Sequence, residues 1–537
     1  MAEQEAVAKL LQSPETYGLD PGREVTRIDT HASMVFLAGD HAYKVKRAVS
    51  YPYMDFGTLD KRRAACAAEI RLNRRTAPEL YLGIRPILRR GDGALSLGEL
   101  LTEGPGQHEA QSDAVEWAVV LKRFPDDALL SQVVARGELN DTILDSLAAE
   151  IAAFHEAAEP VCGGGAAALE AVVEENHGEF AEQPEVFASE ETERLTRESR
   201  SHLRNVSSML DARAEEGLVR RCHGDLHLRN VVMLDGRPRL FDAIEFNDAI
   251  ACIDVLYDLA FLLMDLDMRG PDVSGAGGAA NRIMNSYLGQ RDDVGGLPAL
   301  PLFLSLRAAI RAKVSASALA AQEDDAARER LRHDIGSYFA AARKYLEPSL
   351  PRLVAVGGIS GTGKTTIARL LAPGVGRAPG ALIVRSDVER KRLFGVAETE
   401  RLPESAYQGG ANAHVYDRML SRSRQALDAG QSVVLEATFL RREDRAAARK
   451  LAEAAGVPFQ GVWLTGSPDT LKARVAARQG DASDATVAVV ESQLERAPKG
   501  EIGWPAVSAE GEPDAVAERA RALLQGEGGA DSRSQSH

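Results

Sequence analysis

A glycine-rich motif in the C-terminal third constrains the fold of this 537-residue chain more than any other feature. Residues Gly358 to Thr365 read GISGTGKT, which satisfies the pattern G-x-x-x-x-G-K-S/T. The motif closes the apolar segment LVAVGG and precedes the helix-forming sequence TIARLLA. A loop of this kind between a strand and a helix turns its backbone N–H groups toward phosphates. The chain is therefore predicted to contain a nucleotide-binding domain built on a parallel sheet.

Short apolar segments separated by helix-forming sequence follow the motif. They lie at 381–384, 432–437 and 459–464. Such alternation is typical of a parallel sheet covered by helices. We therefore predict an α/β doubly wound parallel-sheet P-loop domain over 352–525. A disordered tail is predicted over 526–537, where the residues are too small and polar to pack.

The chemistry of the motif predicts what its residues do. The Lys364 side chain places a positive charge near the β- and γ-phosphates of a nucleotide, and the Thr365 hydroxyl is a ligand for Mg²⁺. ATP and Mg²⁺ are therefore the expected cofactors. The nucleotide-binding candidates of this domain are Gly358, Ser360, Gly361, Thr362, Gly363, Lys364, Thr365 and Thr366.

Two carboxylates after the following strands favour phosphoryl transfer over nucleotide binding alone. Asp387 follows the segment 381–384, at the sheet edge where an acceptor would lie beside the phosphates. It is predicted to take a proton from an acceptor hydroxyl, and it is also suited to cap the next helix. Glu436 in VVLEATF stands where a metal-binding Asp is usual, so we expect it near Mg²⁺, directly or through water.

Two arginines precede a loop of small and acidic residues. Arg474 and Arg478 share one face of a predicted helix before the loop GDASDA, as a mobile lid requires. Arg478 is the preferred candidate for neutralising charge on the transferring phosphoryl group. A solvated basic helix face is the alternative interpretation.

These segments together resemble a known class of P-loop kinases over residues 353–523. The class includes the zeta toxins, chloramphenicol phosphotransferase and the kinase half of polynucleotide kinases. The resemblance implies that the acceptor group is a hydroxyl. It does not choose among antibiotics, sugars, nucleotide sugars and nucleic-acid ends.

A second motif, HGDLHLRN, lies at 223–230, and Asp242 follows twelve residues later. Phosphoryl transfer needs a carboxylate at the acceptor hydroxyl and oxygen ligands for Mg²⁺, and this spacing supplies both. The motif resembles the catalytic loop of aminoglycoside phosphotransferases and choline-type kinases, which have the protein-kinase fold. The resemblance implies that Asp225 positions or deprotonates the acceptor while Asn230 and Asp242 hold the metal. Asp258 also resembles a family position and is expected to be structural.

The other parts of a kinase site occur earlier in the chain. The strand-like sequence AYKVK holds Lys44 and Lys46, and Glu69 lies in a following helical segment that can bring it to either lysine. Both lysines point to the same face because strand side chains repeat every two residues, so spacing does not separate them. The alignment of A-x-K with the kinase strand favours Lys44. The segment THAS, with Ser33, stands in place of a glycine-rich nucleotide loop.

The local patterns of the N-terminal part agree with an α+β protein-kinase-like domain over 1–347. Two strand-like segments flank the turn Gly39-Asp40, and a helix is predicted from Thr58. A further strand is expected at 116–124, and mostly helical sequence runs from Asp141. The resemblance covers about 25–345, and the two halves together resemble bacterial proteins described as bifunctional aminoglycoside phosphotransferase and ATP-binding protein.

Composition limits the partners and the compartment. Residues 1–350 hold 39 Lys+Arg against 56 Asp+Glu, a net charge of −17, while 351–537 hold 25 against 23, a net charge of +2. An acidic first part disfavours a nonspecific nucleic-acid binder. The most apolar stretch, 249–268, contains four Asp residues, and the N-terminus lacks a signal-peptide pattern, so we expect a cytoplasmic protein with no membrane partner. Four scattered cysteines indicate neither a zinc site nor a disulfide framework.

The sequence thus predicts two ATP-dependent kinase modules that phosphorylate hydroxyls of small molecules. Two alternatives stay open. One module is a regulatory pseudokinase or nucleotide sensor that controls the other, or the P-loop half is a nucleic-acid end kinase. The identity of either acceptor and the oligomeric state leave no motif in the sequence.

Overall fold

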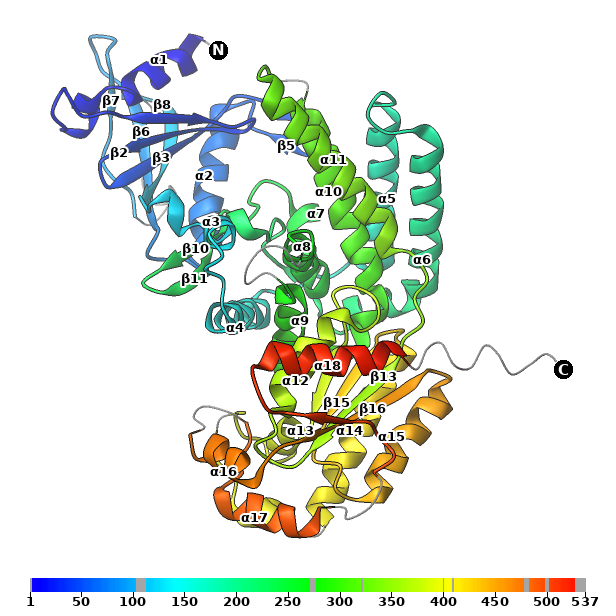
Figure 1. The fold of residues 1–537 in the computed structure, drawn as a ribbon. Helices are drawn as coiled ribbons and strands as arrows, with labels where there is room; N and C mark the ends of the chain where they lie inside the picture. The colour runs from blue at the N-terminus through cyan, green and yellow to red at the C-terminus, as the bar shows by residue number, and fades with distance from the viewer. Residues whose placement is uncertain are drawn as a thin grey trace. The chain divides into compact units, whose positions relative to one another are not determined.

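A computed structural model describes residues 2–102, 113–270, 277–319, 322–398, 400–407, 410–477, 482–497 and 502–526. Contacts between residues divide the chain into two compact units, which are taken one at a time below (Figure 1). The first unit comprises most of 1–175 and 203–266, and the second comprises most of 176–202 and 276–537. The division differs from the predicted domain limits at 347 and 352, which stay a prediction. The predicted tail lies outside the described residues from 527 onward.

An antiparallel sheet of six strands, in the order β1-β2-β3-β8-β6-β7, opens the first unit (Figure 1). The strands are β1 (Thr26–Asp29), β2 (Ser33–Ala38), β3 (His41–Lys46), β6 (Tyr81–Arg89), β7 (Leu95–Leu97) and β8 (Ala114–Lys122). The predicted hairpin is confirmed, since β2 pairs with β3 and Gly39 takes a left-handed φ of 56° in the turn. The predicted helix is confirmed as α2 (Leu59–Asn73), where the Thr58 side chain accepts a hydrogen bond from the Lys61 N–H. Apolar side chains of α2, such as Ile70, pack with the buried face of β6 and β8.

Helices and short strands complete the first unit around the second motif. They include α3 (Leu130–Ala135), α4 (Asp141–Ala157), β9 (Val219–Arg221), β10 (Val231–Leu234), β11 (Arg237–Leu240), α7 (Asp248–Ala251), β12 (Cys252–Asp254) and α8 (Val255–Asp267). The motif lies between β9 and β10, and the β10–β11 hairpin leads directly to Asp242. Helix α8 is buried on all sides from Val255 to Leu266, so it is a core helix against which the motif is held.

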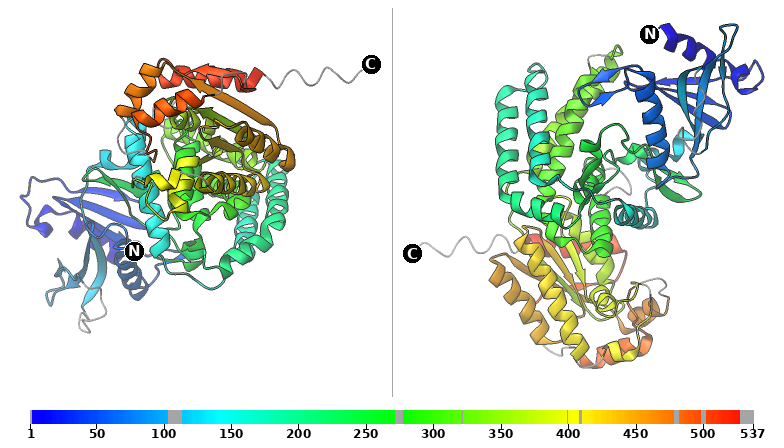
Figure 2. Two further views of the ribbon diagram at one scale, coloured as in Figure 1. Left: turned by 90° about the horizontal axis from the view of Figure 1, so that it is seen from below. Right: turned by 180° about the vertical axis from the view of Figure 1, so that it is seen from behind.

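Long helices account for much of the chain from 165 to 345. Helices α5 (Gly165–Ala181) and α6 (Ser189–Glu215) run through residues of both units. In the second unit, α10 (Leu300–Leu319) and α11 (Asp325–Tyr345) run side by side (Figure 2), and α9 (Ala279–Arg291) precedes them. Among the described residues one helical stretch, Val294–Leu319, is long and apolar enough to cross a membrane, but 78% of its most apolar window is buried in the protein. Burial of that extent is what a core helix shows, so the stretch is weak evidence for a membrane span.

A parallel sheet of five strands, in the order β14-β15-β13-β16-β17, belongs to the second unit. The strands are β13 (Leu353–Gly358), β14 (Leu382–Arg385), β15 (Val433–Glu436), β16 (Phe459–Thr465) and β17 (Ala506–Ser508). All four predicted apolar segments are strands, and all pair in parallel. Val354 and Val356 pack with α12 (Lys364–Leu371) and α18 (Pro513–Gly526), whereas the alternating residues Leu353 and Ala355 are equally buried on the other face. Both faces of the sheet are therefore covered, as in parallel sheets generally.

Candidate active sites

Charged side chains from three distant segments meet in the first unit. Lys44 on β3 lies 3.0 Å from Glu69 Oε1 on α2, and its ammonium group also binds the Asp242 carboxylate after β11. Burial would lower the pKa of Lys44, but the carboxylates of Asp242 and Glu69 raise it well above its ordinary value. The lysine is therefore charged, and it lies between a helix carboxylate and the predicted metal ligand, as phosphate binding requires.

The second lysine of the strand occupies the same charge cluster with a different partner. Lys46 contacts the other oxygen of Glu69, Oε2, at 2.5 Å and also binds Glu245. Lys46, Glu69 and Glu245 are almost completely buried. Of the two lysines that the sequence left open, Lys44 is therefore the one paired with Asp242. The sequence interpretation missed Glu245, although a charged residue inside the apolar run AIEF is a visible signal of a buried ion pair.

The loop of the second motif brings Asp225 and Asn230 together. The Asn230 side-chain amide donates hydrogen bonds to the Asp225 carbonyl at 2.9 Å and to the Asp225 carboxylate at 3.0 Å. These bonds use the nitrogen of Asn230, which leaves its side-chain oxygen as the atom for a cation. Asp242, whose carboxylate is the second oxygen donor, has a left-handed backbone with φ of 61°. Carboxylate and amide oxygens are the donors that Mg²⁺ prefers, so this set fits the expected metal.

Two buried aspartates of α8 fix the shape of this loop. Asp258 accepts hydrogen bonds from the His223 N–H at 3.1 Å and from the Gly224 N–H at 2.8 Å, and His155 Nε2 lies 3.0 Å from the same carboxylate. Asp265 accepts the Leu228 N–H at 3.0 Å. Both carboxylates thus accept hydrogen bonds from backbone N–H groups of the loop. Asp258 therefore has a structural role, as the sequence predicted. Cys222 brings a third possible metal ligand close to His155 and Asp258, but the bonds to the loop already occupy the Asp258 carboxylate.

The segment that replaces a glycine-rich loop turns tightly before β2. The Thr30 hydroxyl accepts a hydrogen bond from the Ser33 N–H at 2.9 Å, which closes the turn with a side chain. Ser33 is 3% exposed and pairs across the hairpin with Lys46. The structure therefore places Ser33 at the charge cluster, and its contact with a nucleotide stays a prediction.

The phosphate loop of the second unit depends on glycine at particular positions. Gly358, Gly361 and Gly363 have φ of 146°, 88° and 78°, a region that residues with a side chain rarely adopt. A Cβ atom at Gly361 would lie 2.6 Å from the Leu471 carbonyl oxygen, so the loop has no room for one. Thr362 closes the loop through a hydrogen bond from its hydroxyl to the Ile359 carbonyl at 2.8 Å.

The predicted metal ligands of this loop meet directly. The Thr365 hydroxyl donates to Glu436 Oε2 at 3.1 Å, so β15 brings its carboxylate to the start of α12. Arg385, at the end of β14, donates to the same Glu436 oxygen at 3.0 Å and to the Thr365 hydroxyl at 3.0 Å. A hydroxyl and a carboxylate fit Mg²⁺ beside a triphosphate. The sequence interpretation missed Arg385, although it is a charged residue directly before Ser386 and Asp387 at the end of a strand.

The predicted acceptor carboxylate lies in the electrostatic field of this cluster. Asp387 is the second residue of α13 (Ser386–Leu393) and is hydrogen-bonded to Ser483. Burial and the nearby charge of Glu436 raise the pKa of Asp387 above its ordinary value, and Arg385 and Lys364 oppose them. A carboxylate with a raised pKa beside a phosphate site suits a general base.

Arg390, one turn further along α13, was not singled out from the sequence. It is 6% exposed, donates to the Ala406 carbonyl at 2.7 Å and lies over the Tyr407 ring at 4.7 Å. Its buried Nε atom has no hydrogen-bond partner among the residues that the structure describes. A buried guanidinium with an unused donor is costly unless a ligand completes it.

Two segments from the region after β16 approach the phosphate loop. The Gln493 side-chain oxygen, on α17 (Val487–Arg496), accepts the Ser360 N–H at 2.7 Å. Arg474 on α16 (Pro468–Ala476) donates to the Ala509 carbonyl at 3.0 Å. Arg478, the preferred lid arginine, lies outside the described residues, and so do residues 479–481, the first part of the loop that follows it.

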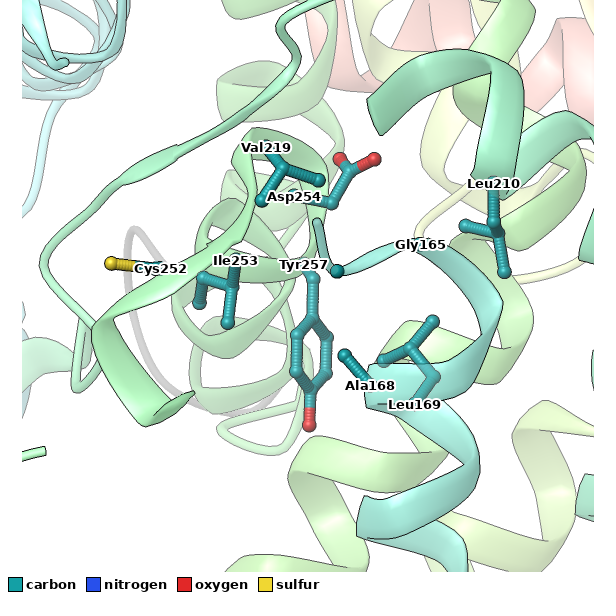
Figure 3. Close-up of a pocket in the computed structure, with 10 residues that line it drawn as sticks. Gly165, Ala168, Leu169, Leu210, Val219, Cys252, Ile253, Asp254 and Tyr257 are labelled. Atoms are coloured by element: carbon teal, nitrogen blue, oxygen red, sulfur yellow. The ribbon is translucent and has the colours of Figure 1, made fainter. Parts of the chain in front are cut away.

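A small pocket in the first unit belongs to neither site (Figure 3). Ala168, Leu169, Leu210 and Val219 line it with apolar side chains. Asp254 at its rim is held by two hydrogen bonds from Arg213, at 2.7 and 2.9 Å. Its cavity volume of about 20 Å³ holds about one water molecule, so it does not admit a nucleotide.

Comparison with protein families confirms the resemblance of both halves. Residues 105–289 match the model of the phosphotransferase enzyme family, and residues 353–499 match a model described as an AAA domain, a P-loop kinase-like type. The first match contains the HGD loop, Asn230, Asp242 and Asp258. The second contains the phosphate loop, Asp387 and Glu436.

Known proteins and solved structures also show similarity to this chain. Uncharacterized proteins of Mycobacterium tuberculosis and Mycobacterium bovis are 30% identical over 477 residues, which is 87% of this chain and 89% of theirs. A gluconokinase from Sinorhizobium meliloti is 24% identical and matches 33% of this chain and 92% of its own length, with a TM-score of 0.23. An ethanolamine kinase of Plasmodium vivax is 10% identical and matches 59% of this chain and 81% of its own, with a TM-score of 0.35.

Proposed function

This chain belongs to the same protein family as the uncharacterized mycobacterial proteins, and from this premise we propose that each of its domains transfers the γ-phosphoryl group of ATP to a hydroxyl of a small molecule. It is a kinase, because both halves match nucleotide-dependent phosphotransferase or P-loop families. The fold classes proposed are protein-kinase-like for the first domain and doubly wound for the second. The antiparallel sheet with α2 supports the former, and the covered parallel sheet supports the latter.

The observation that carries the proposal for the first domain is the ion pairing of Lys44 with both Glu69 and Asp242. In the proposed reaction Lys44 holds the α- and β-phosphates, and Asp225 orients the acceptor hydroxyl and accepts its proton. Asn230 and Asp242 would hold Mg²⁺, which supplies charge neutralisation at the phosphates when bound. The acidic composition of the first part supports an acceptor that is neutral or positively charged.

In the second domain the phosphate loop supplies backbone N–H groups, and Lys364 supplies the charge at the transferring group. Thr365 and Glu436 would hold Mg²⁺, and Arg385 keeps these two side chains in place. Asp387 takes the proton of the acceptor hydroxyl. The buried Arg390 with its unused Nε supports an acceptor that carries a negatively charged group.

Small-molecule acceptors are proposed over nucleic-acid ends. The second part carries a net charge of only +2, with 25 Lys+Arg against 23 Asp+Glu, and a track of phosphates needs several basic contacts. A cytoplasmic location is proposed from the ATP requirement of the two kinase-like domains.

The test uses the full chain in four forms, which are the wild type, Asp225→Asn, Lys364→Ala and the double variant. ADP release with Mg-ATP is measured against sugars, aminoglycosides, nucleosides and oligonucleotide ends. We expect one acceptor whose turnover is lost in Asp225→Asn and kept in Lys364→Ala, and a second whose turnover is lost in Lys364→Ala and kept in Asp225→Asn. If one domain binds ATP and no acceptor stimulates it above the double variant, that domain is a nucleotide sensor and the proposal fails for it.

A further inference from the structure

One edge strand of the parallel sheet is covered by a helix that lies before the P-loop domain in sequence. Strand β14 is one of the two outer strands of the sheet, and an outer strand leaves backbone groups without strand partners. The Asn285 side chain accepts the Ile383 N–H at 2.7 Å and donates to the Ala381 carbonyl at 3.1 Å. Asn281, 2% exposed and one turn earlier on α9, donates to the same carbonyl at 2.9 Å. Two asparagines on one face of α9 therefore form hydrogen bonds with backbone groups at the edge of the sheet, as a neighbouring strand would.

The C-terminal end of α9 is bound by the P-loop domain in return. Arg392, in the last turn of α13, donates to the Gly289 carbonyl at 2.6 Å. Arg422, on α14 (Gly410–Asp428), donates to the Leu288 carbonyl at 3.0 Å. The Leu288 carbonyl also accepts the Asp292 N–H at 3.2 Å, and the last carbonyls of a helix carry partial negative charge, so two arginines are well placed there. Helix α9 is thus fixed at β14 and at α13.

The same helix is part of the phosphotransferase match. That match extends from 105 to 289 and so includes most of α9. By its contacts, however, α9 groups with the parallel sheet. One element therefore belongs to the first kinase by sequence and to the second kinase by packing.

We propose that α9, although its sequence belongs to the phosphotransferase match, is a positioning element of the P-loop kinase. Strand β14 leads without a loop into α13, and Asp387 is the second residue of that helix. Asn281 and Asn285 fix the strand on one side of Asp387, and Arg392 fixes the helix on the other. The asparagines and Arg392 act through Asp387, so in this respect the inference rests on the proposed role of Asp387 as acceptor base.

The test is amide hydrogen exchange on the full chain. In Asn285→Ala the Ile383 N–H loses its acceptor, so its exchange and that of the α13 amides should become at least about tenfold faster. Amides of β13 should be unchanged, and the affinity for the ATP analogue AMPPNP should be unchanged because the phosphate loop follows a different strand. Asn285→Asp keeps the acceptor oxygen but loses the donor to the Ala381 carbonyl, so it should restore slow exchange at Ile383 only in part. Gln290→Ala is the matched control, because Gln290 is exposed on α9 and, within the described parts of the chain, its side chain bonds only to the Ser286 carbonyl.

Two results would overturn the inference. One is exchange at Ile383 and α13 that is equal in Asn285→Ala and Gln290→Ala. The other is faster exchange throughout the sheet together with lost AMPPNP binding. That result would mean that α9 stabilises the whole domain and does not position β14 and α13 in particular. A wild-type chain that shows no phosphoryl transfer would overturn the proposed function instead, and it would leave the exchange result unaffected.

Discussion

The two sites of this chain hold phosphate groups by different means. In the first, the charges belong to side chains far apart in sequence, since Lys44 contacts Glu69 on a helix and Asp242 after a distant hairpin. In the second, eight consecutive residues form the loop, and three of them are glycines with positive φ. The first site therefore depends on the packing of a sheet against a helix, whereas the second depends on local backbone conformation. The difference predicts that side-chain changes disturb the first site most and backbone changes disturb the second.

The largest effect is expected when the shared carboxylate of the first site is removed. Glu69→Gln leaves Lys44 and Lys46 with one carboxylate each in a buried cluster, so unfolding free energy should fall by about 3 kcal/mol. Denaturant unfolding of the first unit measures it. Glu3→Gln is the control, because Glu3 forms an exposed pair with Arg89 and such pairs contribute about 0–1 kcal/mol. Equal losses in the two variants would show that the cluster does not stabilise the first unit.

A smaller effect, on rate alone, is expected from the loop carboxylate of the same site. Asp225→Asn removes the group that accepts the acceptor proton and leaves Asn230 and Asp242 in place. Transfer by the first domain should fall by roughly a hundredfold or more, with ATP affinity unchanged. Steady-state kinetics with the acceptor found for that domain, together with an ATP titration, measures both. Unchanged turnover would remove Asp225 from the reaction.

The backbone dependence of the second site is tested by adding one methyl group. Gly361→Ala places a Cβ atom 2.6 Å from the Leu471 carbonyl at a φ of 88°. Strain of this kind costs about 1–3 kcal/mol, so AMPPNP binding should weaken by roughly tenfold or more. Gly374→Ala is the matched control, because a Cβ there meets no atom within 4 Å and its φ is ordinary. Equal AMPPNP affinity in the two variants would contradict a glycine requirement in the loop.

The smallest effect is a gain in stability that depends on pH. Burial and Glu436 raise the pKa of Asp387 in the folded protein, so the folded state holds its proton more tightly than the unfolded state does. Ionisation therefore destabilises the folded protein as pH rises from the ordinary carboxyl pKa through the raised one, and the penalty is complete above the raised pKa. Asp387→Asn removes it, so the melting temperature should rise at neutral pH and the gain should shrink toward about pH 4. A gain that does not vary with pH would point to packing and not to ionisation.

The contrast between the two sites also explains how much of each site could be predicted from the sequence. The phosphate loop and its Thr365 and Glu436 partners follow from a local motif and from strand order, and the structure brings these residues together. The choice between Lys44 and Lys46 stayed open because a strand places both on one face, and only the position of Asp242 separates them. Glu245, Arg385 and Arg390 were missed because each is defined by a partner that the sequence does not place next to it.

The extent of the folded units was the least predictable feature. Pro348 and Pro351 mark a break in the sequence, and the predicted domains meet there. The bonds from Asn281 and Asn285 to β14 cross that break, and two asparagines in a helix look like ordinary surface residues until their partners are known. Side-chain bonds to a strand edge carry no periodic signal, so composition and periodicity do not reveal them.

The left-handed backbone of Asp242 has a consequence for which amino acids can occupy that position. Among residues with a side chain, Asn and Asp tolerate this conformation best, whereas β-branched residues are severely disfavoured. The backbone conformation and the predicted metal-binding role thus both favour Asp at position 242. A library randomised at codon 242 and sorted for folded protein should return Asp, Asn and Gly, and a further sort for phosphoryl transfer should return Asp alone. The evolutionary freedom of this site is therefore set by local conformation before any substrate is bound.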